Sequence, residues 1–131
     1  MSESLVRVVA AVIVRGEEML VCRRPYHKRH GGRWEFPGGK CRSGESLAAA
    51  TRRELHEELG VQALDVGTPD FIIRDEGSFY LLVFIPVTIN GEPRCREHIE
   101  LRWATQQELA KMPLAPSDGF YLDFLVRRSL G

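Results

Sequence analysis

The stretch at residues 39–61 constrains the fold of this chain most, because it predicts a helix that carries three carboxylates. Glu54, Glu57 and Glu58 are spaced by three and four residues, so a helix would place them on one face. Like charges at this spacing repel one another and destabilise a helix, which favours a bound cation. Ligands that are all oxygen favour a hard cation, Mg²⁺ or Mn²⁺. Taken alone, the spacing is equally typical of a solvated acidic helix face.

The same stretch contains signals for both ends of the helix and for a packed face. Ser43 or Ser46 can cap its start, and Gly60 is a natural residue to end it. Arg53 precedes Glu57 by four residues and can brace that carboxylate. The apolar stripe expected to pack against the rest of the chain consists of Ala48, Leu55 and Leu59. One face of the helix should therefore pack while the neighbouring face presents its carboxylates.

The length and charge of the chain narrow its class. A chain of 131 residues suits one core, so we expect a single domain over residues 1–131. Lys and Arg together number 18, as do Asp and Glu, which argues against binding to a nucleic acid polymer or a membrane through bulk charge. Between Cys22 and Arg42, however, seven basic residues accompany a single acid, directly before the acidic helix. This arrangement suits a polyphosphate that carries a metal ion, although a solvated basic loop is the alternative.

The cysteines and the apolar N-terminal run indicate in which cellular compartment the protein is expected. Three cysteines without a CxxC pair imply neither a disulfide framework nor a structural zinc site. The apolar run at residues 5–14 contains Arg7, is too short to cross a bilayer and lacks the layout of a signal peptide. We therefore expect a cytoplasmic protein, and the sequence leaves its oligomeric state open, a monomer included.

Apolar runs rich in Val, Ile and Leu predict the strands of the fold. Strands are expected at residues 5–14, 19–22, 79–89 and 101–104, with a broken strand at 61–73. Further helices are expected at residues 106–111 and 117–130. Pro86 predicts a bulge or a sheet edge in the far half of its strand. Strands around a central helix, with another helix closing the chain, are typical of an α/β layered domain with a mixed sheet.

The central stretch also resembles the Nudix box, the signature of the Nudix hydrolases, at every defined position. Those positions are Gly39, Glu45, Arg53-Glu54-Leu55, Glu57-Glu58 and Gly60-Val61. Residues 23–24, 34–40, 91–93 and 114–118 resemble the MutT-type branch, which includes 8-oxo-dGTP and CTP-type pyrophosphohydrolases. The resemblance implies a Nudix α/β/α sandwich with a central mixed β-sheet. It also implies metal-dependent hydrolysis of a modified or canonical nucleoside triphosphate to the monophosphate and pyrophosphate, in sanitising or housekeeping of the nucleotide pool.

The resemblance assigns roles in metal binding and catalysis by position in these motifs. It implies that Mg²⁺ or Mn²⁺ is bound by the backbone carbonyl of Gly38 and by Glu54, Glu57, Glu58 and Glu97. Hydrolysis needs a carboxylate that takes a proton from the attacking water, and Glu54 is the first candidate for this base, with Glu97 second. Glu45 would fix the geometry of the box, and Arg53 would orient the glutamates. The expected catalytic residues are thus Arg53, Glu54, Glu57 and Glu97.

The resemblance implies the substrate contacts in the same way. The phosphates would be held by Arg24 and Lys40, with Arg23 as a neighbour. Phe36 would either line the slot for the nucleobase or pack in the core. The loop before the last helix reads the base in MutT-type enzymes, and here it carries Asp118 where the bacterial 8-oxo-dGTP enzyme has Asn. An ionised Asp118 only accepts hydrogen bonds, so it favours a base with an exocyclic amine, such as cytosine or guanine; helix capping is its alternative role.

Two other functions are compatible with parts of the sequence. The first is a Nudix diphosphatase acting on ADP-ribose or a dinucleoside polyphosphate, which the short chain and the MutT-like flanks disfavour. The second is a non-catalytic module that senses nucleotides. Such modules usually lose residues of the box, whereas this box is intact. The nucleoside triphosphate remains the expected substrate.

Overall fold

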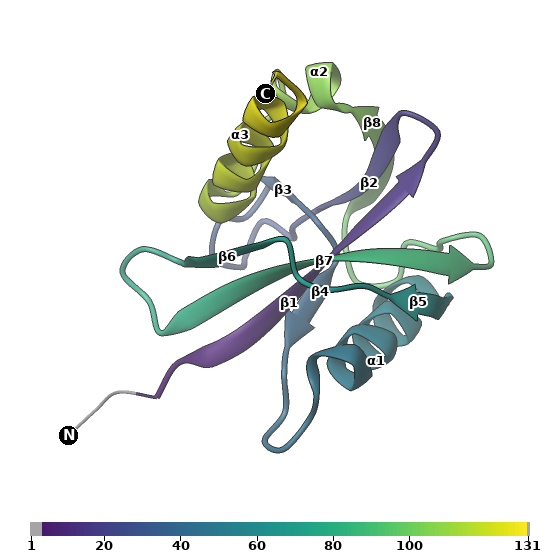
Figure 1. Ribbon diagram of the computed structural model, residues 1–131, viewed down its shortest axis with the longest axis vertical. Coiled ribbons are helices and arrows are strands. Elements are labelled where there is room, and N and C mark those ends of the chain that lie inside the picture. The colour runs from purple at the N-terminus through teal and green to yellow at the C-terminus, as the bar shows by residue number, and fades with distance from the viewer. Residues whose placement is uncertain (1–3, 131) are drawn as a thin grey trace.

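The computed structural model describes residues 4–130 and has a mixed sheet with helices on both faces (Figure 1). The strands are β1 (Val6–Arg15), β2 (Glu18–Arg23), β3 (Trp34–Glu35), β4 (Gly38–Lys40), β5 (Gln62–Val66), β6 (Phe71–Arg74), β7 (Tyr80–Asn90) and β8 (Glu100–Thr105). The helices are α1 (Leu47–Leu59), α2 (Gln106–Leu109) and α3 (Pro116–Leu130). Every predicted strand and helix is present, whereas the short strands β3 and β4 were not predicted.

The sheet is mixed because one of its strand pairs is parallel. β1 and β7 run parallel from the pair Val6 and Tyr80 to the pair Ile13 and Val87, and all other strand pairs are antiparallel. The main order of strands is β3-β2-β1-β7-β5, so the first strand lies at the centre of the sheet. The predicted α/β sandwich with a central mixed sheet is confirmed.

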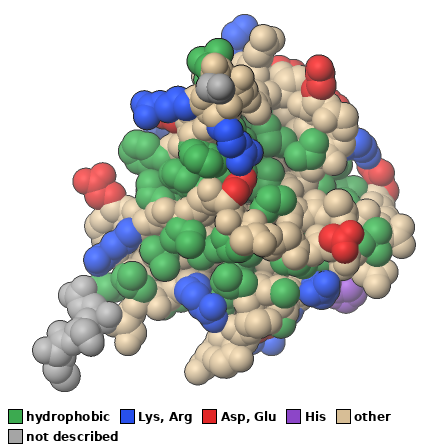
Figure 2. All heavy atoms as spheres, viewed as in Figure 1, with side chains coloured by type: hydrophobic (Ala, Val, Ile, Leu, Met, Phe, Trp, Pro, Cys, Tyr) green, Lys and Arg blue, Asp and Glu red, His purple; other side chains and the backbone are tan. Residues whose placement is uncertain are grey.

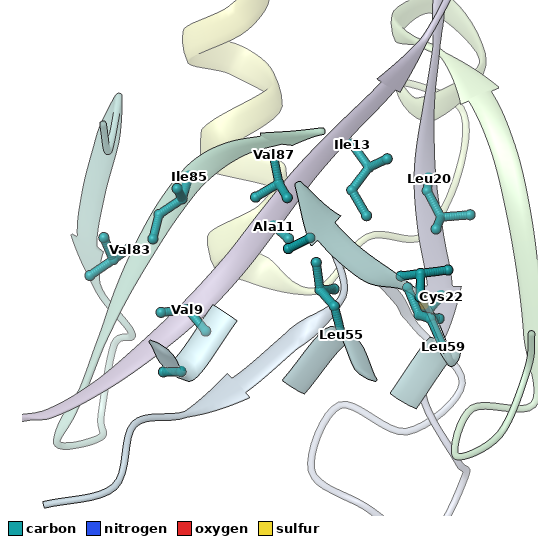
Figure 3. Close-up of a cluster of buried hydrophobic side chains, with 13 residues drawn as sticks. Val9, Ala11, Ile13, Leu20, Cys22, Leu55, Leu59, Val83, Ile85 and Val87 are labelled. Carbon is teal, nitrogen blue, oxygen red and sulfur yellow. The ribbon is translucent and has the colours of Figure 1, made fainter. Parts of the chain in front are cut away.

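Strand β1 is buried on both faces, which explains its nearly continuous apolar sequence. Its odd residues Val9, Ala11 and Ile13 face the core under α1, together with Leu55 and Leu59 of that helix (Figure 3). Ala10 and Val12, on its other face, belong to a second core cluster, which includes the α3 residues Tyr121, Leu122 and Leu125. Each side of the sheet is thus covered by one long helix.

Pro86 lies in the central strand β7, so the prediction of a sheet edge there was wrong. On one side of β7, β6 pairs with residues as far as Phe84, and β5 pairs with residues from Val87 onward. Pro86 falls between these two partners, and its carbonyl accepts a hydrogen bond from Gly67 N at 2.8 Å. A proline is tolerated here because its position lies between the end of the β6 pairing and the start of the β5 pairing, so the sheet loses no ladder hydrogen bond from the missing N–H. A register shift does occur nearby, but it lies in the partner strand β5, between Ala63 and Asp65, and not in the strand for which the bulge was predicted.

Figure 2 shows the molecule in the same view as Figure 1. Most of this surface consists of hydrophobic side chains, uncharged polar side chains and backbone, and the charged side chains lie mainly around its margin. This face therefore lacks the concentration of basic side chains that a polyphosphate would need. Within residues 4–130, no helix is long and apolar enough to cross a membrane.

Candidate functional site

Helix α1 begins and ends where its sequence predicts. The Ser46 side chain accepts a hydrogen bond from Ala49 N at 3.1 Å, so Ser46 and not Ser43 is the cap. Gly60 ends the helix in the left-handed conformation with φ 67°, which glycine adopts without steric cost. One member of the predicted apolar stripe was wrong, because Ala48 is only half-buried. The buried face consists of Ala50, Thr51, Leu55, Glu58 and Leu59.

Arg53 is the centre of a hydrogen-bond network that holds the acidic residues. Its guanidinium donates to both carboxylate oxygens of Glu45 at 2.8 Å, to Glu54 Oε1 at 2.8 Å and to Glu57 Oε2 at 3.4 Å. It also donates to the Lys40 carbonyl at 2.9 Å, which joins the helix to β4. The bidentate contact lowers the pKa of Glu45 to about 2 and keeps that carboxylate ionised. Arg53 is thus held by Glu45 and contacts Glu54, the geometry that its predicted role requires.

Glu58 is the buried acid of the site. Its side chain accepts a hydrogen bond from Gly38 N at 3.1 Å, and only 7% of the residue is exposed. Burial, followed by the charges of Glu54, Glu35 and Glu97, raises its pKa to about 9. Four carboxyl groups from α1, β3 and a distant loop thus act on one another at this point. A bound cation would relieve their repulsion.

Gly39 leaves room for one of these carboxylates. A Cβ at this position would lie 2.5–2.7 Å from the carboxylate atoms of Glu54, well inside van der Waals contact. At Gly38 a Cβ would lie 1.8 Å from the backbone oxygen of Val9 on the paired strand β1. The two glycines therefore serve different purposes, since the first admits a carboxylate and the second admits the neighbouring strand.

The carboxylates border a cavity of about 600 Å³ that also contains basic side chains. The predicted site residues Arg24, Phe36, Gly38, Lys40, Glu54, Glu58, Glu97 and Asp118 all line it. Lys28 and Arg29 add positive charge from the loop after β2. Arg29 is tied across the cavity to the buried Asp75 at 3.3 Å, and Ser117 donates to the other oxygen of Asp75 at 3.0 Å. One cavity thus combines acids that suit a metal ion with cations that suit phosphate groups.

Four residues with predicted roles lie outside the lining of this cavity: Arg23, Glu45, Arg53 and Glu57. Arg23 is turned toward Tyr26 and Trp34, with its guanidinium 5.4 and 5.9 Å from the ring centres. Arg53 lies behind the cavity wall and contacts two of its lining residues, Glu54 and the carbonyl of Lys40. Glu57 points outward, 3.4 Å from Arg53 and 3.7 Å from Arg42.

The predicted metal ligands lie near one another but are not arranged as a coordination shell. Within residues 4–130, no three Asp, Glu, His or Cys side chains form a group that could hold a metal ion as they stand. These carboxylates already accept hydrogen bonds from other groups, since Arg53 donates to Glu54 and Glu57 and the Gly38 amide donates to Glu58. The all-oxygen donor set and the mutual repulsion at Glu58 nevertheless fit a hard divalent cation.

Phe36 and Asp118 connect two distant parts of the chain. Phe36 is 3% exposed and packs edge-on against Phe84 and Tyr121, which makes it a core residue with one edge on the cavity. Asp118 is equally buried, and its Oδ1 accepts a hydrogen bond from Phe36 N at 2.9 Å. Burial, and then the charge of Glu35, raises the pKa of Asp118 well above its usual range.

Residues of the cavity wall that sequence reasoning missed include the polar side chains of Glu35, Asp75 and His98. Glu35 accepts from Arg24 at 2.8 Å and contacts His98 Nε2 at 3.0 Å. Glu35 lies within the motif at residues 34–40 and His98 directly follows Glu97, so their positions beside predicted site residues could have indicated that both belong to the site. Asp75 lies between β6 and β7 in no motif, and only the folded chain shows that it faces the cavity.

Comparisons with known proteins agree with this arrangement. A family model described as NUDIX domain matches residues 5–124, a span that contains every candidate site residue. A Mycobacterium tuberculosis protein with the provisional name 8-oxo-dGTP diphosphatase 2 is 40% identical over 123 residues, covering 92% of this chain and 87% of the relative. CTP pyrophosphohydrolase of Escherichia coli is 37% identical over 117 residues, covering 87% and 86%. The crystal structure of a MutT NUDIX hydrolase from Burkholderia pseudomallei has a TM-score of 0.82 at 28% identity, covering 92% of this chain and 98% of that one.

Proposed function

Because this chain belongs to the Nudix family of hydrolases, we propose that it cleaves a nucleoside triphosphate to the monophosphate and pyrophosphate with Mg²⁺ or Mn²⁺. The observation that carries this proposal is the cavity with acids at one end and cations around it. Its acidic end contains Glu58, whose pKa is raised first by burial and then by three neighbouring carboxylates. Its basic side chains, Arg24, Lys28, Arg29 and Lys40, can receive the phosphates.

The proposed metal ligands are the Gly38 carbonyl and the side chains of Glu54, Glu57, Glu58 and Glu97. A divalent ion bound there would neutralise phosphate charge and lower the pKa of a bound water. Glu57 would join the site by leaving its long contacts to Arg42 and Arg53. Gly38 N donates a hydrogen bond to Glu58, so β4 and α1 are held together at the proposed metal site.

The remaining residues would position the substrate and move a proton. Glu54, held by Arg53 at 2.8 Å, is the proposed base that accepts a proton from the attacking water, and Glu97 is the second candidate. Arg24 would bind phosphate through a guanidinium that Glu35 already orients. Lys40 lies 4.9 Å from the ring centre of Tyr80, at the edge of the cavity. Positioned charges of this kind are the main source of rate acceleration in phosphoryl transfer.

Replacing Gly39 by alanine tests the role of Glu54 without touching its charge. The new Cβ would displace the Glu54 carboxylate, and a misplacement of about 1 Å costs roughly 100-fold in rate. We expect kcat to fall by about that factor while the urea midpoint changes little, because the flexible end of a side chain can move aside. Gly38→Ala is the matched control and should instead destabilise the fold, since its Cβ meets backbone of β1. Full activity of Gly39→Ala would contradict the assignment.

Asp118 is the proposed reader of the nucleobase. One of its oxygens is occupied by Phe36 N–H, so the other is left for the substrate. The raised pKa changes the expectation drawn from the sequence, because a neutral carboxyl group donates one hydrogen bond and still accepts others. Asp118 can therefore pair with a base that offers an amine or with one that offers a carbonyl. The names of the relatives, one CTP pyrophosphohydrolase and one 8-oxo-dGTP diphosphatase, include both kinds of base.

A substrate panel at fixed Mg²⁺ tests both the reaction and the base. Release of pyrophosphate or phosphate would be measured with dCTP, 5-methyl-dCTP, CTP, dGTP, 8-oxo-dGTP and ADP-ribose. We expect triphosphates to be cleaved, and EDTA to stop the reaction. Turnover of ADP-ribose alone would overturn the proposal in favour of a different Nudix diphosphatase.

Asp118→Asn should change the order of substrates in that panel. The amide oxygen can keep the hydrogen bond from Phe36 N, so the fold is retained. Because the amide always presents a donor, we expect the ratio of kcat/KM between cytosine and 8-oxoguanine substrates to shift by about tenfold or more. Asp123→Asn, an exposed change on the same helix, is the control. An unchanged ratio would remove Asp118 from base recognition.

A further inference from the structure

The loop at residues 91–99, between β7 and β8, is attached to the site on both sides of Glu97. Before Glu97, Arg94 N donates to the Leu59 carbonyl at 2.8 Å. After it, Ile99 N donates to the Arg23 carbonyl at 3.0 Å. A loop with such anchors can hold a side chain in place although it has no regular secondary structure.

Glu97 itself has nothing to fix its direction. Its side chain is exposed and borders the cavity, and it makes no hydrogen bond or ion pair with the rest of the described chain. Its charge nevertheless reaches Glu58, because it contributes to the raised pKa of that buried acid. The placement of Glu97 must therefore come from its neighbours.

On one side, Arg96 attaches the loop to the helix that carries the other glutamates. Its Nη1 donates to the His56 carbonyl at 3.1 Å, at the C-terminal end of α1. That carbonyl also accepts from Gly60 N at 3.1 Å, and a guanidinium is favoured as a second donor because the C-terminal end of a helix carries partial negative charge. The guanidinium also lies over Gly60, where a Cβ would come within 2.8 Å of it.

On the other side, His98 attaches the loop to β3. Only 6% of its side chain is exposed, and its Nε2 lies 3.0 Å from Glu35 Oε2. Nδ1 is buried with no hydrogen-bond partner in the structure, so the contact with Glu35 is the one that holds the ring. Glu35 in turn binds Arg24 at 2.8 Å. The chain Arg24–Glu35–His98 therefore connects the proposed phosphate-binding residue to the loop.

We infer that Arg96 and His98 are positioning residues that present Glu97 to the acidic end of the cavity, each from one side. This inference rests on the proposed function, in which Glu97 is a metal ligand. Arg96 lies outside the cavity lining, whereas His98 is part of it and is held there by Glu35. Arg96 sets the distance of the loop from α1, and His98 sets its distance from β3, so that Glu97 lies between the two elements that carry Glu58 and Glu35.

The test is Mn²⁺ binding by the metal-free full chain without nucleotide, followed by electron paramagnetic resonance. Glu97→Gln, which removes a proposed ligand, should weaken Mn²⁺ binding by at least about 100-fold, and His98→Ala by about 10–100-fold, the range found when groups that orient metal ligands are removed. Because His98 acts through Glu97, adding His98→Ala to Glu97→Gln should weaken binding little further. Arg96→Met should behave in the same non-additive way.

His98→Gln keeps the inference testable if His98→Ala unfolds. The glutamine amide can replace Nε2 as the donor to Glu35, so this variant should recover most of the lost Mn²⁺ affinity. Arg94→Ala is the matched control, because Arg94 contributes its backbone N–H to the loop anchor and should bind Mn²⁺ like the unaltered chain.

Several outcomes would overturn the inference. One is unaltered Mn²⁺ affinity in Glu97→Gln. Another is an effect of His98→Ala that is equally large with and without Glu97, which would indicate a structural role alone. These results are distinct from failure of the proposed function, which would appear as Mn²⁺ binding by the unaltered chain without cleavage of any nucleotide in the panel.

Discussion

Replacing Glu57 by glutamine is expected to reduce Mg²⁺-dependent pyrophosphate release by at least about 100-fold, because loss of a metal ligand costs more than loss of its supports. The fold should be unaffected. The Glu57 side chain is 43% exposed, and its contacts with Arg53 and Arg42 are 3.4 and 3.7 Å long. Exposed ion pairs of this kind contribute at most about 1 kcal/mol to stability. Initial rates over a range of Mg²⁺ concentrations, with urea unfolding in parallel, would measure both quantities.

The matched control for this prediction is Glu92→Gln. Glu92 also pairs with an arginine, Arg15, at 3.3 Å, and its side chain is 75% exposed. It lies outside the cavity lining, so its rate and stability should both be unchanged. Full activity of Glu57→Gln with an unchanged dependence on Mg²⁺ concentration would exclude the proposed ligand set. A partial loss that extra Mg²⁺ restores would keep Glu57 as a ligand and show that it mainly sets affinity for the ion.

Helix α1 could be predicted from the sequence because its determinants are local. The cap at Ser46, the left-handed Gly60 and the spacing of the glutamates each depend on residues within a few positions. The same holds for β1, whose apolar run reflects burial on both faces. The resemblance to the Nudix box added the neighbours of the helix, and Arg53 does reach both Glu45 and Glu54.

Contacts between distant residues could not be predicted in this way. Phe36 N and Asp118 are separated by 82 positions and meet in a hydrogen bond, while burial of Asp118 raises its pKa and makes it hard to ionise. The raised pKa of that residue reversed a sequence argument that treated it as an acceptor only. His98 and Glu35 are 63 positions apart, and the sequence around neither residue indicates that the two are in contact. Pro86 shows the same limit, because its tolerance depends on where two partner strands change over.

Glu58 links the site to the pH dependence of folding. Its pKa is raised from the usual 4.5 to about 9, chiefly by burial and then by Glu54, Glu35 and Glu97. Between these two values the folded chain retains a proton that the unfolded chain has released. The contribution of Glu58 to stability is therefore fully present below pH 4.5 and is lost as pH rises toward 9, by about 1.4 kcal/mol per pH unit. Asp118 has the same sign, because burial raises its pKa too.

Urea unfolding of the metal-free chain should therefore show a free energy of unfolding that falls by several kcal/mol between pH 5 and pH 8.5, at about 1.4 kcal/mol per pH unit for Glu58 alone. Glu58→Gln should flatten most of this slope, since a neutral amide has no proton to release. Glu108→Gln is the control, because the pKa of this exposed residue is lowered and it stays ionised throughout this range. Mg²⁺ added at pH 8.5 should restore stability to the unaltered chain by binding the ionised carboxylates. An equally steep slope in Glu58→Gln would show that burial of this carboxyl group is not what couples the site to folding.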